Sequence, residues 1–300
     1  MTASLLAASV DAYREAAAGT TAEIHDITIG PRAILVEAAI DSATGDESFV
    51  TAGLAHRPRG DSTDFADYGV DSLLAAATQS VDDDAGTSTA ARPTDASATV
   101  PPELRGVLPR AVGLATLNAL SAPFLEWTAG DPMERLDDGV ERITTVGLFA
   151  PAFRKFDDVE VRIVERTPVG DLEHPPDVSV SVFDPADAAA AFAGSDVVFI
   201  TGSTLIYGGL ERYLGLAADA TVVLIGASAS CCPGPLFDAG VDLLAGAAVV
   251  DPAAARREIR RGGCGTDLHE AGVRKGYLAA DPAEGATEGR LRLTDTPTHQ

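Results

Sequence analysis

The chain has 300 residues, of which 46% are hydrophobic, enough for two domains with apolar cores. It carries 45 acidic and 22 basic residues, a formal net charge of -23, and its only lysines are Lys155 and Lys275. Such a charge repels nucleic acid phosphates and anionic membrane surfaces, so we expect neither as a partner. Dispersed carboxylates with scarce lysine are typical of adaptation to a very salty cytoplasm, where a Debye length of about 3 Å screens self-repulsion. An ordinary acidic protein is the alternative.

The N-terminal segment predicts an amphipathic helix rather than a signal peptide, because it lacks a basic start and has an early Asp11. No uninterrupted apolar stretch approaches the roughly 18 residues of a membrane span. The three cysteines are an odd number, which argues against a disulfide framework. We therefore expect a cytoplasmic protein.

The first part of the chain predicts an α+β domain formed by residues 1–78 and 103–130. After the N-terminal helix come three strand-like segments rich in Ile, Val and Thr and separated by turn signals: 23–30, 32–40 and 48–55. Helical patterns follow over 67–78 and from Leu104 to about Leu120, where Pro109 either kinks the helix or marks its start. Residues 79–102 have almost no large apolar side chains, so we expect a disordered insertion.

The second part, residues 140–280, predicts a Rossmann-like α/β domain. Four continuous apolar runs alternate with helical or loop segments: 142–150, 159–166, 196–203 and 221–228. A fifth strand is expected over 245–251, before the helix PAAARREIRRGG. Strands that are apolar on both faces favour a doubly wound parallel sheet with helices on both sides. The polar tail, 281–300, is expected to be disordered.

In such a sheet, ligands bind beyond the carboxyl ends of the strands, near the switch in strand order. The first run ends in a loop with Gly147, Phe149 and Pro151 but only one glycine, so either a ligand loop or a plain turn fits. The second run ends in Glu165, which is either a ribose-hydroxyl ligand of a dinucleotide or a solvated carboxylate.

The third run ends in small hydroxyl residues at the start of a helix, which suit an anion or another polar ligand. These residues are Thr201, Gly202, Ser203 and Thr204, and the alternative is that Ser203 or Thr204 only caps the helix. The fourth run continues the pattern with Gly226, Ala227 and Ser228.

The adjacent Cys231 and Cys232 lack the spacing of a tetrahedral zinc site. They would either bind a soft metal ion or act as small apolar fillers. Cys264, close to His269 in sequence, would supply a third thiol if its loop folds back. In the first domain, Asn118 either faces a ligand or ties its apolar helix to a neighbouring backbone, and Glu37 is a second candidate to line that side.

Four segments resemble an uncharacterised family whose proposed activity is heavy-metal chelation: GLATLNALS, VGLFAPAF, ITGSTLIYGGLERYL and VVLIGASASCCPGPLFDAGVDLLAGAAVVDP. The resemblance covers most of residues 5–265 outside the insertion. It implies an enolase-N-terminal-like domain joined to a Rossmann-like one, with a ligand site in the cleft between them. The family pattern has G-P-S-T-P after the fourth strand, so the stretch from Ala227 to Cys232 is a local departure.

The leading hypothesis is a protein that binds an anionic or metal-chelating small molecule, or a heavy-metal ion, in the cleft between its domains. The alternative is an enzyme with a nucleotide-type cofactor, a nucleotide or S-adenosylmethionine, and Glu165 on its ribose. A plain interaction or structural module is a third class. The oligomeric state is left open, with a homodimer as one alternative.

Overall fold

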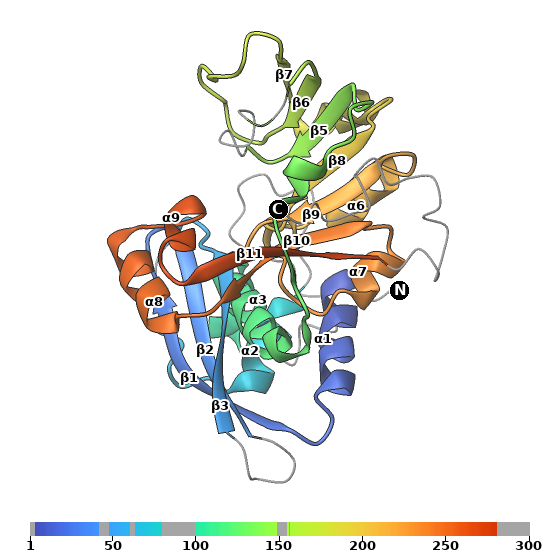
Figure 1. Cartoon of the computed structure of the whole chain (residues 1–300). Coiled ribbons are helices and arrows are strands. Elements are labelled where there is room, and N and C mark those ends of the chain that lie inside the picture. The colour runs from blue at the N-terminus through green and yellow to red at the C-terminus, as the bar shows by residue number, and fades with distance from the viewer. Residues whose placement is uncertain are drawn as a thin grey trace.

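The computed structural model of the chain describes residues 4–41, 48–60, 64–79, 100–148, 155 and 157–280. It is an α/β structure with two sheets, a three-stranded one in the order β1-β2-β3 and an eight-stranded one in the order β4-β11-β10-β9-β8-β5-β6-β7. Figure 1 shows the smaller sheet in the lower half, β5 to β8 in the upper half, and β10 and β11 between them. Within the described residues, no helix combines the length and apolar character that crossing a membrane requires.

The elements of the first part follow the predicted pattern. They are α1 (Leu5–Ala16), β1 (Thr21–Ile29), β2 (Ala33–Asp41), β3 (Ser48–His56), α2 (Val70–Ala77) and α3 (Val107–Ser121), with short 3-10 turns η2 (Pro102–Leu104) and η3 (Ala122–Phe124) around α3. Pro109 is the third residue of α3, where a missing backbone N–H breaks no helical bond, so it marks the start of the helix. Residues 80–99 of the predicted insertion, and the tail 281–300, lie outside the described residues, whereas Gln79 and Val100 are buried.

The three-stranded sheet lies between helices from both halves of the chain. Ile34 and Val36 of β2 share one apolar cluster with α2 and α3. Leu35, on the other face, shares a second cluster with Ile259 of α8 (Pro252–Arg261), and nearby α9 (Thr266–His269) adds Leu268. Glu37 is also on the α8 face, where it accepts hydrogen bonds from Arg256, so it faces the second half of the chain through an ion pair.

The large sheet has six parallel strands: β5 (Arg142–Val146), β6 (Glu160–Val164), β7 (Ser179–Phe183), β8 (Val197–Thr201), β9 (Thr221–Ile225) and β10 (Leu243–Val249). The four apolar runs are therefore parallel neighbours, as predicted. The expectation of a purely parallel sheet is wrong, because β11 (Val273–Ala279) is antiparallel to β10 and to the short β4 (Thr128–Ala129). Neither β7 nor β11 is a continuous apolar run, since serines alternate in β7 and β11 holds exposed Arg274 and Lys275.

Helices α8 and α9 pack beside β10 and β11, in the cluster that contains Val249 and Val273. Four other helices lie together on one face of the large sheet. They are α4 (Ala188–Phe192), which follows the turn η6 (Pro185–Asp187), α5 (Thr204–Tyr207), α6 (Leu210–Leu216) and α7 (Gly234–Asp238), and they share the cluster of α1 and α3. The opposite cluster contains Met133 of the turn η4 (Pro132–Arg135) and the loop residues Val140 and Val178. The prediction of helices on both sides is thus wrong for the β6–β7 connection, whose prolines at 168, 175 and 176 disfavour a helix.

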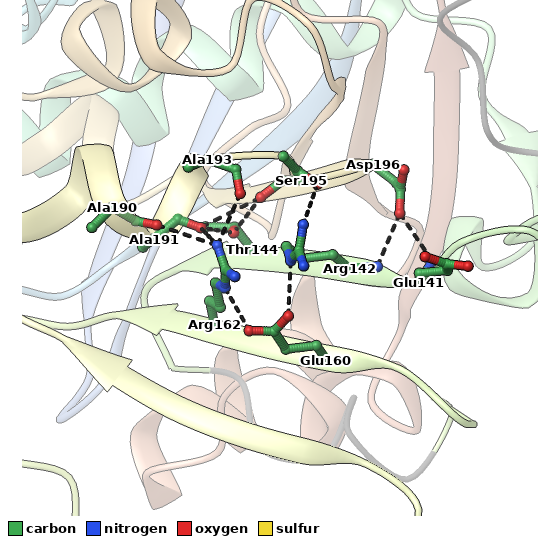
Figure 2. A network of polar contacts seen from close by, with 11 residues as sticks. Glu141, Arg142, Thr144, Glu160, Arg162, Ala190, Ala191, Ala193, Ser195 and Asp196 are labelled. Carbon is green, nitrogen blue, oxygen red and sulfur yellow. Dashed lines mark hydrogen bonds and ion pairs between the residues drawn. The ribbon is translucent and has the colours of Figure 1, made fainter.

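A polar network joins the amino-terminal ends of β5, β6 and β8 (Figure 2). Glu160 accepts hydrogen bonds from Arg142 at 2.8 Å and from Arg162 at 2.7 Å. Asp196 accepts from the backbone N–H groups of Glu141 and Arg142, both at 2.9 Å. These contacts hold the strands in register at the end of the sheet opposite to the predicted ligand loops.

Candidate functional site

The chain order of the parallel strands reverses between β5 and β8, so the carboxyl ends of these two strands mark the switch point. Gly147 follows β5 with a φ of +88°, and a Cβ atom there would lie 2.6 Å from Oγ1 of Thr201 at the end of β8. Both the conformation and the space require glycine. The first and third predicted loops therefore lie in direct contact. Phe149 and Pro151 of the first loop lie outside the described residues.

The hydroxyl residues after β8 divide into two roles. Thr204 is buried and donates to the carbonyl oxygen of Thr201 at 2.8 Å, so it closes the local turn. Oγ1 of Thr201 lies 2.9 Å from Oγ of Ser203, and both residues are partly exposed. Gly202 is buried against Ala229. Thr201 and Ser203 are thus the members of this loop that a ligand can reach.

The loop after β9 ties the two halves of the chain together. Oγ of Ser228 accepts from the backbone N–H of His56, at the end of β3, at 2.9 Å. Nδ2 of Asn118 donates to the carbonyl oxygens of Leu54 at 2.8 Å and Ser228 at 3.1 Å. These contacts correspond to the second alternative for Asn118, in which the side chain ties its helix to a neighbouring backbone. Its Oδ1 has no hydrogen-bond partner in the described part of the chain. Gly226 and Ala227 lie in the same loop and are less buried than Ser228.

Glu165 lies at the end of β6, and its carboxylate accepts hydrogen bonds from the backbone of the loops that follow β5 and β6. It accepts hydrogen bonds from the backbone N–H groups of Leu148 at 3.1 Å, Arg166 at 2.8 Å and Thr167 at 3.1 Å. These bonds join the tips of β5 and β6 and partly neutralise the negative charge. Oε1 accepts from the N–H groups of Arg166 and Thr167 and from the Thr167 hydroxyl, whereas the one bond given for Oε2 is that from Leu148.

A group of side chains that the sequence pattern did not indicate gathers around Tyr207, the last residue of α5. Nε2 of His56 lies 3.2 Å from the Tyr207 hydroxyl oxygen. The guanidinium of Arg166 lies over the Tyr207 ring, with Cζ 4.3 Å from the ring centroid. Arg57 follows His56 directly in the chain, and Arg59 comes two residues later, after Pro58. We call Arg57, Arg59 and Arg166 the arginine trio.

The electrostatics of Tyr207 and His56 reflect this gathering. Burial raises the pKa of Tyr207, against the opposing positive charges of Arg166, Arg59 and Arg57. Desolvation lowers the pKa of the His56 imidazole, and the charge of Arg166 lowers it further. Both shifts favour the neutral forms of the imidazole and the phenol, beside the permanent charge of Arg166 and within the electrostatic influence of Arg59 and Arg57.

The arginine trio is not neutralised by carboxylates within the described residues, where no ion pair involves any of its members. This is unusual in a chain with 45 acidic and 22 basic residues. The sequence held one indication of the group: two arginines in the tetrapeptide RPRG and one directly after Glu165, in a chain poor in basic residues.

The cysteines do not fit a heavy-metal ion. Cys231 is fully buried in the main apolar cluster, and burial, with Cys232 adding, raises its pKa to about 12. Metal ligation needs the thiolate, which this environment disfavours. Cys264 packs in the separate cluster beside α8, so the three thiols do not converge. The described residues contain no group of three or more His, Cys, Asp or Glu side chains that could hold a metal ion.

Comparisons with known proteins agree on one family. Residues 131–277 match the family DUF364, described as "Putative heavy-metal chelation". A crystal structure of a DUF364 protein of unknown function from Pyrococcus horikoshii has a TM-score of 0.66 at 18% identity, covering 92% of this chain and 100% of that one. Another, from Desulfitobacterium hafniense DCB-2, has a TM-score of 0.61 at 15% identity, with 91% and 100% covered. No curated protein matches the sequence. Residues 131–277 are thus similar to the DUF364 family, and the chain shares its fold along nearly its whole length with two DUF364 proteins of unknown function.

Proposed function

We propose that this protein binds a small anionic ligand at the junction between the end of β3 and the carboxyl ends of β5, β6 and β8. The observation that carries the proposal is the arginine trio beside Tyr207, unpaired within the described residues of a chain with a net charge of -23. Guanidinium groups are permanent cations that only donate hydrogen bonds, so they attract carboxylates and phosphates. The hydroxyls of Thr201 and Ser203, at the neighbouring strand tip, would add uncharged hydrogen-bond partners.

The arginine trio also bears on the metal chelation suggested for the family. Guanidinium groups have no lone pair to give to a metal and repel a bare cation. A metal complex with a net negative charge meets neither objection. Under this proposal, any metal reaches the junction already held by an anionic chelator.

A nucleotide-type ligand is the second candidate, favoured by the strand order. Numbered along the chain from β5 to β10, the six parallel strands lie in the order 3-2-1-4-5-6, which is the order of dinucleotide-binding folds. This supports a Rossmann-like interpretation of the second half. In such folds the ligand lies at the switch point, here the contact between Gly147 and Thr201.

Titration calorimetry tests the proposal with four ligands: citrate, inorganic phosphate, Ni²⁺ and the Ni²⁺–citrate complex. We expect saturable binding of at least one anion, weakened about tenfold or more in Arg59→Ala/Arg166→Ala, because each lost guanidinium removes charge-assisted hydrogen bonds. Both side chains are exposed, so the variant should keep its fold. Tight binding of Ni²⁺ alone, with no heat from any anion, would contradict the proposal.

A further inference from the structure

Building on the proposed function, we infer that the anion recognised at this junction is a phosphomonoester dianion rather than a carboxylate, held by Arg57, Arg59 and Arg166. The first argument is the number of charges. One arginine fork satisfies both oxygens of a carboxylate, so three arginines exceed what a single carboxylate can use. A phosphomonoester presents three acceptor oxygens and a charge of about -1.5 to -2 near neutral pH. Its size and charge match a group of several guanidinium forks.

The second argument is an unused donor on Arg57. Its Nη2 donates to the carbonyl oxygen of Gly60 at 2.7 Å, which holds the side chain against its own turn. Its Nε is buried and has no hydrogen-bond acceptor among the residues that the structure describes. A buried donor without an acceptor costs free energy, and a ligand oxygen would remove that cost.

The third argument concerns which side chain at the carboxyl end of β6, Glu165 or Arg166, is better placed to contact a ligand. In dinucleotide-binding folds, an acidic residue near this position binds a ribose hydroxyl, whereas an arginine accommodates a phosphate on that ribose. Here Oε1 of Glu165 is engaged by the backbone N–H groups of Arg166 and Thr167, which leaves only Oε2, itself an acceptor for Leu148, to a ribose hydroxyl. Arg166 follows directly and lies over the Tyr207 ring. The tip is therefore arranged for a phosphate.

The fourth argument is that Arg166 is positioned before any ligand arrives. The Tyr207 ring beneath its guanidinium is itself held by the contact of its hydroxyl with His56. A cation–π contact restricts the guanidinium without using its N–H donors, which stay free for phosphate oxygens. Because less side-chain freedom is lost on binding, a fixed Arg166 favours affinity.

The test compares adenosine 2′-monophosphate, inorganic phosphate, adenosine and malonate by titration calorimetry at constant KCl concentration. We expect both phosphates to bind at least tenfold more tightly than malonate, and adenosine alone not to bind. The variant Arg166→Ala should weaken phosphate binding about tenfold or more. The matched control is Arg260→Ala on α8, an exposed arginine in another part of the fold, which should leave binding unchanged.

The outcomes separate this inference from the proposed function. If malonate binds as tightly as phosphate and both are weakened by Arg166→Ala, the anion site stands and the phosphomonoester preference is overturned. If phosphate binds equally well to wild type and Arg166→Ala, the assignment to this junction is overturned. If no anion binds, the inference and the proposed function both fall.

Discussion

Gly53 in β3 is the point where the three-stranded sheet approaches α3 most closely, and its replacement by alanine should destabilise the protein. A Cβ atom there would lie 2.1 Å from the backbone N of Ala119 and 2.4 Å from the carbonyl oxygen of Ala115. Both contacts are to backbone of a buried helix, which no side-chain rotation can relieve. The strand and the helix must therefore move apart, stretching the hydrogen bond from Asn118 to Leu54.

The size of the effect follows from two opposing contributions. Overpacking of a buried contact costs about 1–3 kcal/mol, and rigid backbone on both sides favours the upper end. The lower conformational freedom of alanine in the unfolded chain returns about 0.4–1 kcal/mol. We expect a net loss of about 2 kcal/mol, or a fall in Tm of roughly 4–8 °C at about 2–4 °C per kcal/mol.

Thermal and denaturant unfolding, followed by circular dichroism, would measure this change. The matched control is Gly215→Ala in α6, where an added Cβ meets nothing within 4 Å. Because alanine favours a helix over glycine by about 0.5–1 kcal/mol, the control should be slightly stabilised. A Gly53→Ala protein with the Tm of wild type, or a higher one, would show that the close approach of β3 and α3 is not as we describe it.

Three further predictions concern charge and thiols. Hydrogen bonds from Arg162 and Arg142 lower the pKa of Glu160 in the folded protein. The stability that ionised Glu160 gives to the fold is therefore complete above the ordinary carboxyl pKa of about 4.3, and it is lost as the pH falls through the lowered pKa of the folded state. Replacing Glu160 by glutamine should lower the free energy of unfolding by about 1 kcal/mol at neutral pH, a modest loss because the side chain is 35% exposed. The replacement should also flatten the acid limb of a plot of unfolding free energy against pH. An unchanged limb would refute this. Ellman's reagent should modify Cys264 in the folded protein, and Cys231 only after unfolding, because the latter is buried and protonated; rapid native labelling of Cys231 would contradict its described environment. Raising KCl from low to molar concentration should raise Tm, because salt screens the repulsion within a chain of net charge -23, whereas an equally concentrated neutral osmolyte should do less. A Tm independent of KCl would argue against adaptation to salt.

The sequence predicted most of the elements, because their signals are local. The apolar runs that became β5, β6, β8 and β9 are continuous, and the rule that such strands lie parallel held for all four. The same rule missed β7 and β11, because a strand at or near the edge of a sheet can carry polar residues without burying them. The same rule predicted helices on both faces of the sheet, but the connection between β6 and β7 is a loop with prolines that packs on the sheet in place of a helix.

The residues of the candidate site were also predictable only in part from the sequence. The rule that ligands meet carboxyl ends of parallel strands selected Gly147 and Thr201, and the structure brings these two residues into contact. The rule could not tell that Asn118 and Ser228 are used to join the halves, because hydrogen-bond partners depend on packing between segments far apart in the chain.

The arginine trio shows most clearly what only the tertiary structure decides. Arg57 and Arg59 follow β3, Arg166 follows β6, and the pair that brings these segments together, His56 and Tyr207, is 151 positions apart in the chain. Periodicity and loop chemistry determine which strand or helix forms, because those preferences act within a few residues. The packing of one sheet against the other determines which charges meet, because Coulomb interactions depend on distance in space and not on position in the sequence.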